Sequence, residues 1–287
     1  MTNEQRWQRR TVGVIPRVML WLSLLGVALP ASADDLTFGI VPQESLSRLA
    51  EQWTPLLQYL SGVTGTDIRF ASAPDIPTFE QRLLKGEYDI AYMNPYHYVE
   101  FSQSPGYRAI AREGGKLITG IVVVPENSPV TDLAELANDV IAFPAPAAFA
   151  ATILVRAELE QREIPYTPRF VSSHQSVYLN VANGFASAGG GIERTYGAAV
   201  SDGLTGLRVL WRSNGYTPHA FAVHPRVDLQ LAARVQHELA TLASHEVGRA
   251  WLGTMNMTPL ISAEDNDWQD VRSLGLDFIR RPETADQ

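Results

Sequence analysis

The sequence contains no cysteine among its 287 residues. Disulfide bonds, thiolate catalysis, thiolate metal sites and a lipidated N-terminal cysteine are therefore all excluded. Without covalent cross-links the fold depends on its hydrophobic core. A chain of this length with 45% hydrophobic residues can build such a core, as one large domain or two medium ones.

Positive charge is also scarce, because 23 Lys and Arg residues face 31 Asp and Glu residues and the formal net charge is −8. Residues 1–33 hold four Arg and one Glu, a net +3, so the rest of the chain has a net charge of −11. A nucleic-acid partner would need a clustered basic face, and this balance argues against one. The charge favours a soluble protein in an aqueous compartment.

Long apolar runs are missing except near the N-terminus. There, four arginines precede a run of about a dozen apolar residues, which is too short to span roughly 30 Å of hydrocarbon. The run closes on Ala31-Ser32-Ala33. This pattern predicts a secretory signal peptide at residues 1–33, cleaved after Ala33, and a periplasmic protein. An uncleaved membrane anchor is the alternative.

The remaining chain alternates short apolar runs with amphipathic stretches. Strands are expected at 36–42, 68–70, 88–92 and 109–112, with helices at 46–61 and 76–84. A second set comprises strands at 140–143, 167–171 and 186–189, with helices at 147–162 and 174–183. Strand, helix and strand at this pitch are typical of parallel βαβ units, so an α/β fold is expected.

Two extended apolar segments, 117–125 and 207–212, bracket the second set and are expected to cross between two lobes. Lobe 1 would then comprise 34–120 plus 210–287, and lobe 2 would comprise 121–209. The predicted architecture is two α/β lobes with mixed sheets flanked by helices and a hinge of two crossing segments. A ligand cleft is expected at the carboxyl ends of the strands.

Four sequence blocks occur in an order that indicates a family: FGIVPQESLSRLAEQWTPLLQYL, EYDIAYMNPYHY, VSSHQSVYLNVANG and VLWRSNGYTPHAF. They resemble the substrate-binding proteins of phosphonate ABC transporters, the PhnD-like group, over roughly residues 36–252. The resemblance implies a type II periplasmic binding protein, in which two lobes close on a small ligand by hinge bending. It also implies a non-catalytic protein without a cofactor, and we expect a monomer.

The resemblance departs from the family at the ligand pocket. The family holds an oxyanion with a Ser-Thr-Ser-Gly turn that opens a helix, and this turn falls on residues 147–150, which read Ala-Ala-Phe-Ala. Two pocket tyrosines match Ile76 and Ile118. Because each hydroxyl bond to a charged oxygen contributes about 1.5 to 3 kcal/mol, a neutral, partly apolar or flat ligand is expected to fit better than a tetrahedral dianion.

The candidate ligand contacts lie on loops and helix starts of the expected cleft. They are His174, Glu193, Phe149, Ala148, Tyr96, His97, His219 and Glu44. The resemblance implies that the histidine and the acid at 174 and 193 are kept, whereas residue 219 replaces the family's acid for a ligand amine. A histidine at that position favours a carboxylated or neutral ligand over an amine.

Each candidate has a structural alternative. The histidine at 174 could simply bond to its own turn, and the acids at 44 and 193 could serve their own helices. The aromatic ring at 149 could be a core residue. The pair at 96 and 97 could pack on the lobe, beside Asn94, which is expected to cap a helix that starts at Pro95.

Enzyme motifs are not matched. The segments HELAT and HEVGR lack the second histidine of a zinc helix, GFASAG does not fit the nucleophile elbow, and AGGGIER lacks the last glycine of the dinucleotide fingerprint. Neither a metal nor a cofactor is expected. Two partners in the inner membrane remain open: an ABC permease that receives the small-molecule ligand, or a sensor kinase that responds to the ligand-bound protein.

Overall fold

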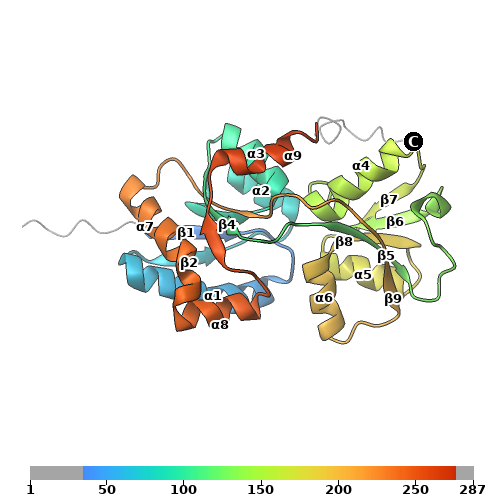
Figure 1. The fold of residues 1–287 in the computed structure, drawn as a ribbon, viewed down its shortest axis with the longest axis horizontal. Coiled ribbons are helices and arrows are strands. Elements are labelled where there is room, and N and C mark those ends of the chain that lie inside the picture. The colour runs from blue at the N-terminus through green and yellow to red at the C-terminus, as the bar shows by residue number, and fades with distance from the viewer. Residues whose placement is uncertain (1–34, 276–287) are drawn as a thin grey trace, which may run out of the picture. The chain divides into compact units, whose positions relative to one another are not determined.

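The computed structural model describes residues 35–275. The predicted signal peptide, residues 1–33, lies outside them. The described chain forms two mixed β-sheets flanked by helices, in the alternation that the sequence predicts (Figure 1). No helix in this part of the chain is both long and apolar enough to cross a membrane.

The first sheet has the strand order β11-β4-β10-β3-β1-β2. Strands β2 and β3 are parallel to β1, whereas β10 is antiparallel to β3 and β4, and β11 is antiparallel to β4. The bounds are β1 Leu36–Ile40, β2 Ile68–Ala71, β3 Ile90–Met93, β4 Arg108–Glu113, β10 Ala220–Val223 and β11 Leu260–Ser262. The segments that follow β1 and β3 therefore leave the same edge of the sheet.

Helices cover both faces of this sheet, with α1 and α8 on one face and α2 and α3 on the other (Figure 1). The bounds are α1 Leu46–Thr64, α2 Ile76–Leu84, α3 Pro95–Gln103, α7 Leu229–Ala240, η3 Leu242–Ser244 and α8 Glu246–Thr254. The apolar stripe of α1 buries Trp53, whose ring lies 4.7 Å from that of Tyr92 and 5.3 Å from that of Trp251. These aromatic contacts form the centre of the core.

The second sheet has the strand order β7-β6-β8-β5-β9, with β6 parallel to β7 and β8, and β5 antiparallel to β8 and β9. The bounds are β5 Gly120–Pro125, β6 Val140–Phe143, β7 Thr167–Phe170, β8 Ala188–Ile192 and β9 Leu207–Arg212; η1 Leu133–Leu136, η2 Phe149–Ile153, α4 Leu154–Gln161, α5 His174–Ala182 and α6 Glu193–Ser201. Val122 and Val124 pack in one cluster with α4, and Ile121 and Val123 in another with α5. Helices therefore cover both faces here too.

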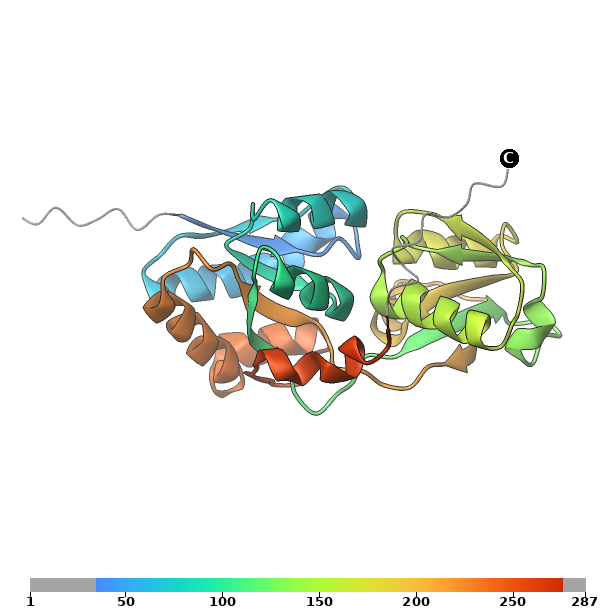
Figure 2. The ribbon, with the colours of Figure 1, turned by 90° about the horizontal axis from the view of Figure 1, so that it is seen from above.

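The chain passes between the two sheets twice, through residues 114–119 and 213–219 (Figures 1 and 2). The two crossing segments are tied together by an antiparallel bridge between Ile118 and Tyr216, whose N–O distances are 2.8 and 3.0 Å. Each crossing is thus held by the other at this one bridge.

The crossings differ from the segments that were expected to form them, 117–125 and 207–212. Most of these residues belong to β5 and β9, which pair with each other inside the second sheet. Strand β5 is buried on both faces, so its apolar run does not alternate. Strand pairing places 120–212 in one sheet, while the lobe boundaries near 120 and 210 stay a prediction.

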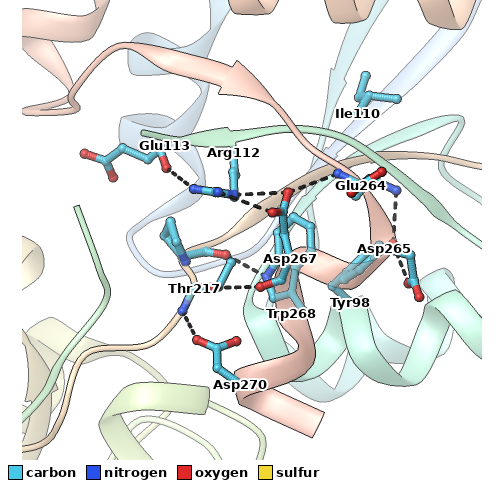
Figure 3. A network of polar contacts seen from close by, with 12 residues as sticks. Tyr98, Ile110, Arg112, Glu113, Thr217, Glu264, Asp265, Asp267, Trp268 and Asp270 are labelled. Carbon is cyan, nitrogen blue, oxygen red and sulfur yellow. Dashed lines mark hydrogen bonds and ion pairs between the residues drawn. The ribbon is translucent and has the colours of Figure 1, made fainter. Parts of the chain in front are cut away.

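A C-terminal strap, residues 264–272 with η4 Asp265–Trp268 and α9 Gln269–Arg272, holds the second crossing (Figure 3). The backbone N–H of Thr217 donates to Asp270 Oδ2 at 2.7 Å, and its hydroxyl donates to the carbonyl of Asp267 at 2.8 Å. Trp268 Nε1 donates to the carbonyl of Pro218 at 2.9 Å. The next residue along the chain is the histidine at 219, so the strap fixes its approach to the cleft.

Candidate functional site

Loops from both sheets and both crossings meet around an inner cavity of about 10 Å³, no more than a single water needs. Apart from the crossings, its walls come from the segments after β1, β2, β3, β6 and β7 and from the last residue of β8, which are the carboxyl ends of the parallel strands. The lining residues are Val41, Gln43, Ile76, Asn94, Ile118, Ala148, Phe149, Ala150, Ala151, His174, Ile192 and His219. Most positions that the resemblance assigns to the phosphonate pocket therefore share one cavity.

The turn at 147–150 opens a helical stretch of one π-turn, η2, followed by α4. Thr152 closes the turn, because its hydroxyl donates to the carbonyl of Ala145 at 2.7 Å. The backbone N–H groups of 149, 150 and 151 meet no backbone acceptor among the described residues, as expected for a helix start. The turn thus keeps unpaired N–H donors beside the cavity although its hydroxyls are absent.

Phe149 is both a wall of the inner cavity and a core residue. Its side chain is 1% exposed, and its ring meets that of Tyr216 edge to face, with centroids 5.9 Å apart. The two alternatives for this ring, cleft lining and core packing, are therefore compatible in one position. Its contact with a ligand, like that of Ala148 in the same wall, stays a prediction.

His174 begins α5 behind its N-cap, Ser173, and is buried. Nδ1 lies 3.2 Å from Oγ1 of Thr195, whose hydroxyl also meets the Tyr178 hydroxyl at 2.7 Å. Burial, and secondly the charge of Arg194, lowers the pKa of His174 to about 3. The ring therefore faces the cavity as a neutral imidazole, which donates one hydrogen bond from one ring nitrogen and accepts one at the other.

His219 comes from the second crossing and is also buried. Its ring stacks on Tyr92 at 4.9 Å, and Nε2 lies 3.1 Å from Nε2 of Gln43. Burial, followed by the nearby charge of Arg194, lowers the pKa of His219 well below its usual value. The histidine is thus neutral at ordinary pH, and it does not supply the positive charge that would draw a carboxylate.

An outer cavity of about 90 Å³ adjoins the inner one and shares Ile118, Ile192 and His219 with it. Its other lining residues are Tyr92, Glu113, Lys116, Leu117, Thr119, Glu193, Arg194 and Pro218. Arg194 is half-buried and donates from Nη2 to Oε1 of Gln43, and it has no carboxylate partner among residues 35–275. Within the described part of the chain, the amide of Gln43 is therefore the only polar partner of this cation in the cleft.

The two carboxylates of the outer cavity are engaged elsewhere. Glu193, the predicted contact, accepts from Arg212 Nε at 2.6 Å across the neighbouring strand. Glu113 accepts from the backbone N–H and the hydroxyl of Thr258 at 2.8 and 3.1 Å. Neither acid neutralises Arg194, so its charge is available to a solute.

Tyr96 and His97 lie outside these cavities. Both are buried on α3, whose N-cap is Asn94, as predicted, with the His97 N–H donating to Asn94 Oδ1 at 2.8 Å. Nε2 of the His97 ring lies 3.5 Å from Oε1 of Glu80. The structure thus gives these two side chains a packing position beneath the cleft, and their ligand contact stays a prediction.

Glu44 is also set apart from the inner cavity. It precedes α1, and its carboxylate pairs with Arg48 Nε in the first turn of that helix at 2.6 Å; both residues, with His174, line a third small cavity. Among residues 35–275, no three His, Asp or Glu side chains come together as a metal site. Of the eight predicted contacts, the inner cavity gathers four, at 148, 149, 174 and 219, and the outer cavity adds Glu193.

Sequence reasoning missed Gln43, Lys116 and Arg194. Gln43 lies in the first of the four family blocks but was not singled out there, no motif marks Lys116, and only the fold brings the three residues to one cleft. One signal could have found the arginine: it directly follows Glu193 at the start of the helix behind the glycine run. Of the three missed residues, Arg194 matters most, because it adds a half-buried positive charge to the site.

Comparison with known proteins gives a family match over most of the chain. The model of the family described as ABC transporter, phosphonate, periplasmic substrate-binding protein matches residues 38–268. The chain is 22% identical over 214 residues to the phosphate-import protein PhnD of Mycolicibacterium smegmatis. That alignment covers 67% of this chain and 66% of the relative, slightly less than two thirds of its length.

Solved structures share the fold at low sequence identity. PhnD1 from Prochlorococcus marinus in complex with methylphosphonate superposes with a TM-score of 0.78 at 14% identity, covering 86% of this chain and 98% of that one. A histidine kinase sensor domain with similarity to periplasmic binding proteins superposes with a TM-score of 0.59 at 14% identity, covering 79% of this chain and 99% of that one. The type II periplasmic binding protein fold is thus shared by transport and sensor proteins.

Proposed function

The chain belongs to the family of periplasmic substrate-binding proteins of phosphonate ABC transporters, and from this premise we propose that it holds one small solute between its two sheets and delivers it to an ABC permease. The observation that carries the proposal is the cavity at the carboxyl ends of the parallel strands of both sheets. Closure of the crossings around a solute would bring both sets of loops onto it. The role is that of a carrier without catalysis.

The solute is proposed to differ from a tetrahedral dianion. The turn at 147–150 offers backbone donors and an aromatic ring, but no hydroxyl. Three missing charge-assisted bonds of about 1.5 to 3 kcal/mol each would weaken the binding of such a dianion by orders of magnitude. Phosphonate, phosphate or phosphite is therefore expected to bind weakly, and a compact, flat solute is expected to bind better.

Delivery to an inner-membrane permease requires export, for which residues 1–33 are the proposed cleavable signal. The protein is proposed to act as a monomer in the periplasm. Edman sequencing of the exported protein is expected to start at Asp34. A start at Met1 in the membrane fraction would instead support the anchor.

Ligand-dependent thermal unfolding tests the proposed binding. A solute at 100 times its dissociation constant adds roughly 2.7 kcal/mol, which raises the melting temperature of a domain this size by roughly 5–10 °C. The shift is expected to shrink in His174→Ala and to change its solute preference toward oxyanions in Phe149→Ser. The cleft is the wrong site if both variants keep the wild-type response to every solute.

A second candidate is a periplasmic binding module that reports its solute to a membrane sensor kinase. It is favoured by the similarity to the histidine kinase sensor domain. Uptake of labelled solute by cells that lack the gene separates the two roles. Lost uptake supports the carrier, whereas normal uptake with a lost transcriptional response to the solute supports the sensor.

A further inference from the structure

We propose that Arg194 is the anchor of the solute and that the solute is a compact monocarboxylate with a short apolar body. This inference rests on the proposed function, because it names the class of solute that the cleft would take. Of the carboxylated and the neutral ligand that the histidine at 219 was expected to favour, it selects the carboxylated one. The expectation of a flat ligand is retained.

The first step concerns the charge of Arg194. The guanidinium is half-buried and has an amide oxygen of Gln43, but no carboxylate, as its partner in the described chain. A cation that is partly removed from water without a counter-ion is unfavourable, so a protein gains by supplying one from a ligand. Its field reaches the walls of both cavities: burial is the main cause of the lowered pKa values of His174 and His219, and the Arg194 charge adds to it, while at Tyr92 the same charge opposes the rise in pKa that burial causes.

The second step concerns the number of charges. The outer cavity holds two cations, Arg194 and Lys116, and two carboxylates, Glu113 and Glu193. Both histidines of the cleft are neutral. The single charge of a monoanion is balanced by the guanidinium, so the two acids repel it little. The second charge of a dianion would be repelled by these acids and would have no further buried cation to bind.

The third step concerns shape. A guanidinium presents two parallel N–H groups that match the two oxygens of a planar carboxylate. The walls near it include the apolar side chains of Leu117, Ile118 and Ile192, and the outer cavity measures about 90 Å³. A planar acid with a few aliphatic carbons fits both the fork and the walls.

Four probes with the same propyl body separate the features of the head group. Butyrate has a planar, monoanionic head group, that of butyramide is planar and neutral, and that of propane-1-sulfonate is tetrahedral and monoanionic. Propylphosphonate has a tetrahedral head group that is a dianion on a large fraction of its molecules at pH 8. Calorimetric titration of the mature protein is expected to show butyrate binding at least about tenfold more tightly than each of the others. Equal or tighter binding of the sulfonate or the phosphonate would overturn the planar monoanion.

Variants then test the anchor. Arg194→Gln is expected to weaken butyrate binding at least about tenfold and to leave butyramide binding nearly unchanged. Arg194→Lys is expected to recover part of the lost butyrate affinity, because lysine restores the positive charge but not the two parallel N–H donors. Arg162→Gln is the matched control, since it removes one arginine charge from an exposed ion pair with Asp132 in the same sheet unit. Urea unfolding of each variant checks that the fold is intact.

The outcomes distinguish this inference from the proposed function. A solute that raises the melting temperature of the wild type and binds equally well to Arg194→Gln would overturn the carboxylate anchor and leave the carrier role standing. No response of the wild type to the four probes or to a broad solute screen would contradict both. Selective loss of butyrate in Arg194→Gln alone supports both.

Discussion

Single residues set the charge of the cleft. The buried rings of His174 and His219 have lowered pKa values, so pH changes near neutrality leave them uncharged. Arg194 therefore determines the electrostatic preference of the site, together with the more exposed Lys116. The cleft would select its solute by one fixed cation and a set of neutral donors and acceptors, and its solute affinity should vary little between pH 6 and pH 8 on account of these groups.

Glu80 is the residue whose charge should affect folding most clearly. Burial, and then the charge of Glu100, raises the pKa of Glu80 to about 7, while burial lowers the pKa of His97 to about 3. Their 3.5 Å contact thus joins two neutral groups near pH 6. A raised carboxyl pKa contributes stability that is full below about pH 4.5 and is lost as the pH rises through 7.

Glu80→Gln should therefore raise the free energy of unfolding at pH 8 by about 2 kcal/mol relative to the wild type, and change it little at pH 4. Urea unfolding at the two pH values measures this difference. Glu163→Gln, at an exposed carboxylate, serves as the control and is expected to give the same small change at both. A Glu80 variant that is destabilised equally at both pH values would contradict a buried, neutral carboxyl.

At the scale of elements, two glycines of the second sheet allow η2, the helical turn that begins at the cleft, to lie close to the strands. A Cβ on Gly190 of β8 would lie 1.9 Å from the carbonyl oxygen of Ala151, and one on Gly120 of β5 would lie 2.2 Å from that of Ala150. The first turn of η2 thus rests directly on the backbone of two neighbouring strands. Its position therefore requires residues without a side chain at these two places in the sheet.

Gly190→Ala is expected to lower the free energy of unfolding by about 3 kcal/mol, because the methyl group must push backbone away. Gly197 lies inside α6, and a Cβ added there would have no atom within 4 Å, so Gly197→Ala is the matched control. It should raise the free energy of unfolding by about 0.5–1 kcal/mol through helix propensity. Equal effects of the two substitutions in urea unfolding would show that η2 does not sit on β8 as described.

The sequence predicted the elements wherever a short apolar run or a helical spacing was complete. The strands at 140–143 and 167–171 and the helix at 174–183 are close to β6, β7 and α5. The run at 117–125 was misinterpreted as a crossing, because a central strand and a buried linker have the same apolar composition. No element was predicted after residue 212, although the spacing of buried residues in α7 is a clear helical signal.

The site residues also divide into those that the sequence predicted and those that it did not. Ala148, Phe149, His174 and His219 came from a resemblance and do line one cavity. Arg194, Gln43 and Lys116 did not, because an isolated charge or amide has no pattern in sequence, and only tertiary packing brings the loop after β1 to the start of α6. The charge of a cleft is thus harder to predict than its walls.

At the scale of the whole described chain, polar contacts between the two sheet units hold the cleft closed. Asn94 Nδ2 donates to the carbonyl of Ala147 at 3.0 Å and Arg194 reaches Gln43, whereas the third contact, between Arg48 and Asp202, is an exposed ion pair that adds little. In this closed arrangement the inner cavity, at about 10 Å³, has no space for a solute. Solute entry into the inner cavity therefore requires movement at the crossings.

Asn94→Asp should favour the open arrangement while it preserves the helix cap. The carboxylate still accepts from the N–H of residue 97, but it cannot donate to the carbonyl of Ala147 and repels it. A loss of about 1–3 kcal/mol would raise the ratio of open to closed molecules roughly 5- to 150-fold. Small-angle scattering of the solute-free protein is expected to show a larger radius of gyration.

Asp202→Asn is the comparison for this closure test, since its exposed ion pair with Arg48 contributes little. It should leave the radius of gyration close to that of the wild type. An unchanged radius in Asn94→Asp, with normal urea unfolding, would mean that Asn94 acts as a helix cap alone.

The C-terminal strap has a consequence for biosynthesis. The ribosome adds residues 264–272 after every strand of both sheets, yet Asp270 and Trp268 bind the segment that leads into His219. A nascent chain can therefore pair all its strands before the solute site is complete. A product that stops short of Trp268 would contain every strand of both sheets but would lack a fully buried core residue and the hold on the histidine, so its cleft would be defective.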